Sequence, residues 1–140
     1  MKFRYQRWMI KTSLIYLLVG VLIGLLIFLA DLFPSLEWIY DWRTVHVHLI
    51  LVGSVIQMIM GVALWMFPRR KEPPPVTTEP EGMTLYVAFN ASTVIRSLCE
   101  PFWQSGSFFY FLTLGGMMLQ VLSILYFLYL VLQRIRAPAA

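Results

Sequence analysis

The sequence predicts an all-α membrane protein with four transmembrane helices and both termini in the cytoplasm. Hydrophobic residues make up 59% of the 140 residues and charged residues only 13%, whereas a soluble domain usually carries about 25% charged residues. The apolar residues are gathered in long runs, and basic residues lie at the ends of these runs. One membrane domain accounts for residues 1–140, and lipid must cover much of its apolar surface.

Three of the predicted spans are long apolar runs. They cover about residues 13–33, 44–67 and 108–132, and each has the roughly 20 residues that the hydrocarbon core of a bilayer requires. The remaining span, about residues 83–99, is shorter and more polar. We predict that it also crosses the membrane. Without this crossing, the basic residues that follow the second span and those that follow the last span would lie on opposite sides of the membrane. Its polar residues are Asn90, Ser92, Thr93 and Arg96.

The basic residues predict the orientation of the chain. They precede the first span, follow the second and follow the fourth, so a four-span topology places them all on one side, which the positive-inside rule makes cytoplasmic. These residues are Lys2, Arg4, Arg7, Lys11, Arg69, Arg70, Lys71, Arg134 and Arg136. The pattern predicts a multi-pass protein of the cytoplasmic (inner) membrane, with a proline-rich cytoplasmic linker at residues 72–82. The net charge of +4 is explained by this orientation and predicts no nucleic-acid partner.

The only two histidines, His46 and His48, lie at the outer end of the second span. Two residues on an α-helix correspond to about 200° of rotation, so the imidazoles leave on opposite faces and cannot readily chelate one ion together. At helical spacing, His46 aligns with Gly53 and Gln57. Glycine leaves room for a flat group or for another backbone, so this face is notched and partly polar.

Imidazole nitrogens at this position predict a haem iron site with His46 and His48 as the metal ligands. A neutral imidazole is an axial ligand of haem iron, and haem is a large flat cofactor that helix bundles can hold in membranes. The alternative is that both rings lie near the membrane interface and bond to loop carbonyls or lipid headgroups. The residues alone leave both interpretations open.

Two arginines are candidates for contacts with the haem propionates. Arg96 lies late in the third span, at about the membrane depth of the histidines, and an arginine inside a span usually faces the protein interior with a partner. Its guanidinium suits a propionate carboxylate, while an ion pair with Glu100, one turn further on, is an alternative compatible with the first. Arg43, one turn before His46, is either a second propionate contact or an interfacial anchor beside the aromatic residues of the preceding loop.

The segment Arg43-Thr-Val-His46-Val-His48, continuing through Gly53 to Phe67-Pro68-Arg69, resembles part of subunit I of the haem-copper oxygen reductases and nitric oxide reductases. The stretch from Arg96 to Glu100-Pro101 resembles the end of the helix that follows there. That family has twelve core helices in three arcs of four, and its His-x-His ligates two different haems.

The resemblance has consequences for the assembly and for the chemistry of the site. A homotrimer of this chain would rebuild the twelve-helix arrangement, with His46 of one subunit and His48 of the next ligating one haem b. The chain has no further histidine, so it cannot build the family's copper site alone or as a homo-oligomer.

The sequence therefore predicts a small haem b protein for electron transfer or haem carriage, with a redox partner and no catalytic residue of its own. One alternative is a cofactor-free accessory or assembly subunit. Another is an enzyme or sensor with five-coordinate haem that binds oxygen or nitric oxide. Haem with two imidazole ligands has no open position, which favours electron transfer over catalysis. Whether the protein is an enzyme stays open at this point.

Overall fold

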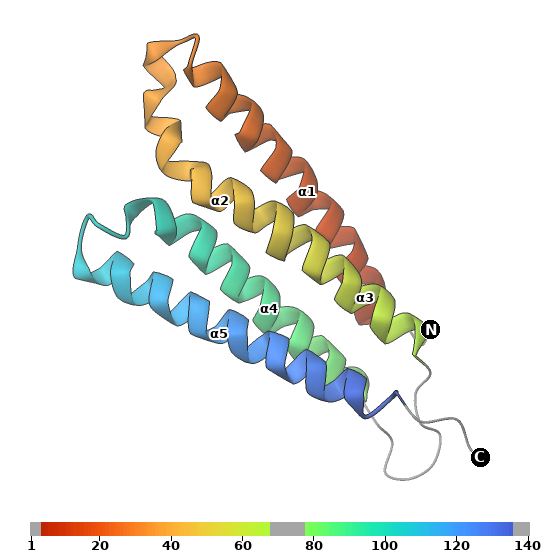
Figure 1. The fold of residues 1–140 in the computed structure, drawn as a ribbon. Helices are drawn as coiled ribbons and strands as arrows, with labels where there is room; N and C mark the ends of the chain where they lie inside the picture. Colours follow the sequence, from red (N-terminus) through yellow and green to blue (C-terminus); the bar gives the residue numbers. More distant parts are fainter. Residues whose placement is uncertain (1–3, 68–77, 136–140) are drawn as a thin grey trace.

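The computed structural model describes residues 4–67 and 78–135, and every regular element in these ranges is helical. Figure 1 shows two antiparallel helical hairpins that lie side by side. The elements of the first hairpin are α1 (Arg4–Ala30), the 3₁₀-helix η1 (Pro34–Trp42), α2 (Arg43–His48), the π-helix η2 (Leu49–Ile56) and α3 (Gln57–Met66). Those of the second are α4 (Glu79–Cys99), the 3₁₀-helix η3 (Glu100–Phe102) and α5 (Ser107–Leu132).

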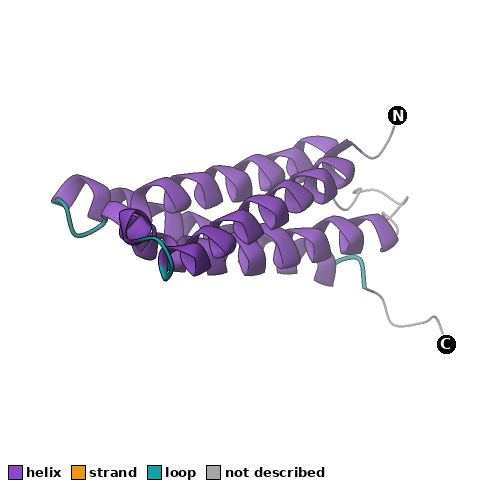
Figure 2. Ribbon diagram, turned by 90° about the horizontal axis from the view of Figure 1, so that it is seen from above, coloured by secondary structure: helices purple, strands orange, loops and turns teal. Residues whose placement is uncertain are grey.

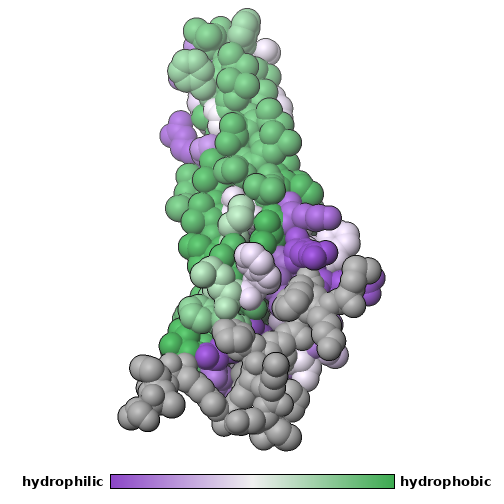
Figure 3. All heavy atoms as spheres, turned by 90° about the vertical axis from the view of Figure 1, so that its right-hand side faces the viewer, coloured by the Kyte–Doolittle hydropathy of each residue, from purple (hydrophilic) through white to green (hydrophobic). Residues whose placement is uncertain are grey.

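Three helical stretches are long and apolar enough to cross a membrane. They are Arg4–Ala30, the continuous stretch Pro34–Met66, and Ser107–Leu132. Figure 3 shows that apolar side chains cover most of the visible face, as expected of a protein whose surface faces lipid. The predicted helical membrane protein is confirmed to this extent. A fourth crossing by α4 stays a prediction, because α4 is not among these stretches.

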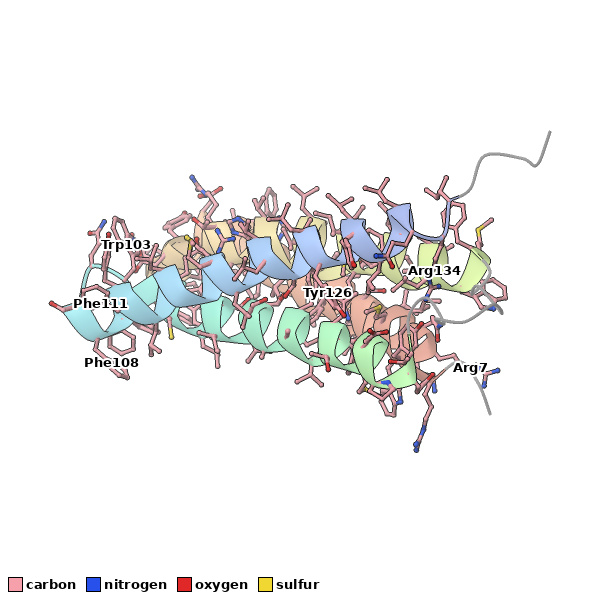
Figure 4. All side chains as sticks on the ribbon, turned by 90° about the horizontal axis from the view of Figure 1, so that it is seen from below. Arg7, Trp103, Phe108, Phe111, Tyr126 and Arg134 are labelled. Atoms are coloured by element: carbon pink, nitrogen blue, oxygen red, sulfur yellow. The ribbon has the colours of Figure 1, made fainter. Side chains whose placement is uncertain are left out.

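The helices run nearly parallel to one another from end to end (Figure 2). One end, here called the loop end, holds η1, η3 and the turn after η3 (Figure 1). The opposite end, here called the basal end, holds the start of α1, the end of α3, the start of α4 and the end of α5. Trp103, Phe108 and Phe111 gather at the loop end, whereas Arg7 and Arg134 lie at the basal end (Figure 4).

The helices extend beyond two of the predicted segments. The helix that contains the first predicted span, about residues 13–33, begins at Arg4, because the residues before the apolar run pack into the bundle, with Tyr5 and Met9 fully buried. The last residues of the predicted linker are helical, because α4 begins at Glu79. Thr78 and Glu81 form a reciprocal capping box there, which satisfies backbone donors of the first turn. Residues 72–77 of the linker lie outside the described residues.

The buried apolar core lies toward the basal end, where all four long helical segments contribute to it. Its members are Tyr5, Met9, Met60, Leu64, Leu85, Phe89, Phe127, Leu130 and Val131. Arg134, only 6% exposed, closes this core by donating to the carbonyl oxygens of Leu64 (2.8 Å) and Phe67 (3.3 Å). The last carbonyls of a helix have no partner within it and favour a cation, so Arg134 joins α5 to the end of α3.

Candidate functional site

His46 lies against α1. Its Nδ1 is 2.7 Å from the carbonyl oxygen of Gly20, and a carbonyl can only accept, so Nδ1 carries the hydrogen and Nε2 carries the lone pair. The ring lies over Gly24, where an added Cβ would be 2.5 Å from the His46 Cε1. The Gly20-x-x-x-Gly24 pair thus joins two helices of the same chain and makes room for this imidazole.

His48 lies on the other side of α2 and faces α4. Its Nε2 is 2.8 Å from Nη2 of Arg96, and because a guanidinium only donates, this nitrogen accepts and Nδ1 carries the hydrogen. Nδ1 is 2.9 Å from the carbonyl oxygen of Thr44 and 3.5 Å from Oε2 of Glu100. The two imidazoles therefore serve different helices, as their spacing in the sequence predicts.

Arg96 connects the polar groups between α2, α4 and α5. It donates to both carboxylate oxygens of Glu100, through Nε and Nη2 at 3.3 Å each, so the predicted ion pair is present. Its Nη1 also donates to Oε1 of Gln120 on α5 at 2.9 Å. Gln120 in turn donates to Thr93 at 3.3 Å. A sequence reading could not supply the contacts of Arg96 with Gln120 and His48, because they depend on how the second hairpin packs against the first.

Glu100 is ionised in this cluster. Burial raises the pKa of its carboxyl, but hydrogen bonds from His48 and Arg96 and the positive charge of Arg96 outweigh burial and leave that pKa below its ordinary value. The carboxylate of Glu100 therefore balances the guanidinium of Arg96.

The other two predicted cofactor contacts, Arg43 and Gly53, lie outside this cluster. Arg43 is exposed, and its guanidinium carbon lies 5.6 Å from the centre of the Tyr40 ring, which matches the predicted interfacial anchor. Gly53 faces α1, where an added Cβ would be 3.0 Å from Cγ of Tyr16. In this chain, the notch that Gly53 provides receives the Tyr16 ring.

A second polar cluster lies deeper in the bundle and was not foreseen as a unit. Tyr16 donates to Oδ1 of Asn90 at 2.9 Å, while Nε2 of Gln57 lies 3.1 Å from the Thr12 hydroxyl and 3.3 Å from the same Asn90 oxygen. These contacts tie together α1, α3 and α4. In the sequence, the only indication of this cluster was the presence of the polar residues Gln57 and Asn90 within predicted spans. Their partners on α1 follow only from the packing of the helices.

Within residues 4–67 and 78–135, no group of three or more histidine, cysteine, aspartate or glutamate side chains could hold a metal ion. A haem iron takes only its axial ligands from the protein, so the haem prediction is neither tested nor excluded by this finding. No family model, curated protein or solved structure matches the chain. The function is therefore argued from the geometry of the site.

Proposed function

We propose that this chain is a small haem b-binding protein of the cytoplasmic membrane, serving electron transfer or haem carriage, with His46 and His48 as the axial ligands. The observation that carries the proposal is the contact that Nδ1 of each ring makes with a backbone carbonyl oxygen. Each Nδ1–H is held by a backbone carbonyl, of Gly20 at 2.7 Å and of Thr44 at 2.9 Å. This leaves Nε2 of each ring with the lone pair, the form in which an imidazole ligates iron.

The residues around His48 fit a haem chemically. Its Nε2 accepts a hydrogen bond from Arg96 in this chain, so ligation by His48 requires the guanidinium to leave that nitrogen. A guanidinium released from an imidazole is a strong donor to a propionate carboxylate. Haem, when bound, supplies a one-electron redox centre. Arg43 stays in the proposal as a further propionate contact. Gly53 stays as a position of close backbone approach that the Tyr16 ring has to leave first.

The opposite directions of the two rings are the reason to propose a homotrimer. His46 faces α1 and His48 faces α4 of the same chain, so one helix does not close both sides of one haem, and each ring has to leave these contacts to meet a neighbouring copy. A second histidine must then come from another copy, because the chain has only these two. In a ring with threefold symmetry every interface is heterologous, so His46 of one copy meets His48 of the next. The resemblance to haem-copper subunit I leads to the same arrangement.

The surface of α4 supports the proposed four-span topology. Its exposed large side chains are the apolar Val87, Val94 and Leu98, whereas Ser92 and Thr93 are buried. Apolar side chains outside and polar ones inside are typical of a helix in lipid. The basal end carries Arg7 and Arg134, and the loop end carries the aromatic Trp103 (Figure 4). By the positive-inside rule, the basal end is cytoplasmic.

Cysteine labelling tests the topology. In a Cys99→Ala background, which removes the only native thiol, Ser35→Cys in η1 is expected to react with a membrane-impermeant maleimide added to intact cells. Thr77→Cys is expected to react only after the membrane is opened, because the basic residues hold that side in the cytoplasm. The reverse pattern would contradict the orientation. Labelling of both cysteines from outside would contradict a membrane crossing by the stretch Pro34–Met66, most of which lies between them.

A cofactor-free accessory or assembly subunit is the second candidate, and one observation favours it. The polar groups of the His48–Arg96–Glu100–Gln120 cluster bond to one another within the chain, as expected if they serve only to join helices. An absorption spectrum of the purified protein, oxidised and reduced, separates the two candidates. Carbon monoxide added to the reduced protein then identifies a five-coordinate haem, the third candidate, by a spectral change that a haem with two imidazole ligands does not show.

Arg96 also sets a prediction for the reduction potential. Arg96→Leu is expected to lower the haem reduction potential by tens of millivolts, because a nearby positive charge stabilises the reduced haem, which is more negative by one unit. The same substitution leaves Glu100 without its counter-ion, which shifts the potential in the same direction. A redox titration of the purified variant measures the shift. Arg96→Lys keeps the charge and is the matched control. An unchanged potential with normal haem content in Arg96→Leu would contradict the propionate contact. The role of Arg96 in the wild-type protein would then be the ion pair with Glu100.

A further inference from the structure

A groove of about 210 Å³ lies at the basal end, between α1 and the end of α3. It is lined by Gln6, Arg7 and Ile10 of α1 and by Trp65 of α3. The two helices are in close contact one turn before Trp65, where a Cβ added to Gly61 would be 3.0 Å from Cγ1 of Ile10. No residue of the proposed haem site lines this groove, so the two sites are distinct.

Three cations follow one face of α1 beside the groove. Arg4, Arg7 and Lys11 are spaced by three and four residues, which places them on one side of the helix, and all three are exposed. Neither α1 nor α3 contains an aspartate or a glutamate. Among the residues that the structure describes, no carboxylate forms an ion pair with any of the three. Their positive charge is therefore available to an anionic ligand.

Two exposed tryptophans border these cations. Trp65 in the wall of the groove is 60% exposed, and Trp8 is 50% exposed. The Nζ of Lys11 lies 5.8 Å from the centre of the Trp8 ring. Indole rings are enriched at the membrane–water interface, where the ring lies among apolar groups and its N–H reaches polar ones. The groove is therefore expected at the level of the lipid headgroups.

We infer that this groove binds an anionic phospholipid, with the phosphate at Arg7 and the start of an acyl chain along Ile10 and Trp65. A guanidinium donates paired hydrogen bonds to phosphate oxygens, and the indole N–H of Trp65 is a further donor. A zwitterionic headgroup fits less well, because its ammonium group would face the same three cations. Basic pockets between helices on the cytoplasmic side of a membrane typically hold anionic lipids, and the basal end is the side proposed to be cytoplasmic.

Tryptophan fluorescence of the purified full-length protein in bilayer discs tests the inference. The discs consist of phosphatidylcholine with a small fraction of a lipid that carries bromine near the headgroup end of an acyl chain, because bromine quenches a tryptophan that it contacts. Brominated phosphatidylglycerol is expected to quench more strongly than the same fraction of brominated phosphatidylcholine. Trp65→Phe is expected to remove this excess quenching, whereas Trp103→Phe at the loop end (Figure 4) should keep it.

The charge of Arg7 is expected to determine the preference for the anionic lipid. From the contribution of one cation near an anionic membrane surface, Arg7→Gln should raise the fraction of brominated phosphatidylglycerol that gives half of the excess quenching by about fivefold. Arg7→Lys keeps the charge and should keep most of the preference. Arg43→Gln is the matched control, since it removes one positive charge from an exposed residue at the loop end and so measures the general effect of charge.

Three results would overturn the inference: equal quenching by the two brominated lipids, excess quenching that Trp65→Phe leaves unchanged, or equal effects of Arg7→Gln and Arg43→Gln. Soluble glycerol phosphate then separates a lipid from a free phosphate ester. If it removes the excess quenching, the occupant is a free phosphate ester and the lipid site is contradicted. Circular dichroism checks that each variant keeps its helix content. Both leaflets of a disc carry the brominated lipid and none of the comparisons requires haem, so a failed haem or orientation proposal leaves this one standing.

Discussion

Purified protein carrying His48→Gln is expected to lose its haem while keeping its fold. The glutamine amide oxygen reaches about the position of the imidazole Nε2 and can still accept the hydrogen bond from Arg96, which the histidine accepts at 2.8 Å. Glutamine does not replace imidazole as an axial ligand. Loss of a group that only supports a metal ligand typically costs about 10–100-fold in affinity, so loss of the ligand itself is expected to cost at least as much. The ratio of haem absorbance to protein measures this.

His46→Asn is the corresponding variant on the other side of the helix. The asparagine side-chain nitrogen takes the place of Nδ1 and can still donate to the carbonyl of Gly20, which Nδ1 approaches to 2.7 Å, but no atom replaces Nε2. Haem loss in both conservative variants, with unchanged helix content by circular dichroism, is the expected result. Full haem content and an unchanged spectrum in both would contradict ligation by this pair and favour the accessory subunit.

Co-expression of His46→Ala and His48→Ala chains is expected to restore part of the haem that each variant lacks alone. An interface is intact when it joins the remaining His46 of one chain to the remaining His48 of the next. If threefold rings assemble at random from equal amounts of the two chains, about a quarter of all interfaces are intact. Haem content should therefore recover to about a quarter of the wild-type value. Two differently tagged chains, purified in sequence, isolate the mixed assemblies, in which haem content should reach about a third of the wild-type value because one of the three interfaces is intact.

Other assemblies give different results in the same experiment. A monomer that binds haem cannot recover any by mixing. A twofold assembly whose haem lies on the axis, between two copies of the same histidine, would lose haem in only one of the two single variants. Absence of recovery in confirmed mixed assemblies would rule out the shared-haem trimer. Co-expression of His46→Ala with itself under two tags is the control for haem bound outside the site.

The long apolar helices were the part of the fold that could best be predicted from the sequence. A run such as residues 108–132 is apolar all round, which in a chain of this composition leaves few alternatives to a lipid-exposed helix, and α5 spans Ser107–Leu132. The helix ends were less predictable, because apolar runs mark the hydrocarbon core and not the backbone hydrogen bonding. Tyr5 is fully buried in a segment that reads as an interfacial tail, and only packing reveals this.

In the site too, contacts between residues close in the sequence could be predicted, whereas contacts between different helices could not. The ion pair of Arg96 with Glu100 follows from a four-residue spacing, and it was expected. The Tyr16 ring on Gly53 joins residues on two different helices, and a glycine in a sequence does not indicate what fills the space beside it. Arg134 illustrates a further limit: its charge indicated orientation, while its buried contacts with Leu64 and Phe67 could not be read from the sequence.

The π-helix η2, from Leu49 to Ile56, separates His48 from Gln57. Its hydrogen-bonding pattern affects the direction in which the two histidines leave the helix. A π turn holds one residue more than an α turn, so it behaves as an insertion that the helix has absorbed without breaking. A chain with one residue fewer in this segment could continue as an unbroken α-helix with its two flanks in nearly the same relative rotation. If the present chain formed an unbroken α-helix here, everything before the segment would turn by about 100° relative to α3. His46 would then leave Gly20, and His48 would leave Arg96, although no contacting residue had changed. The π-helical hydrogen bonding of this segment therefore keeps the histidines in their present direction.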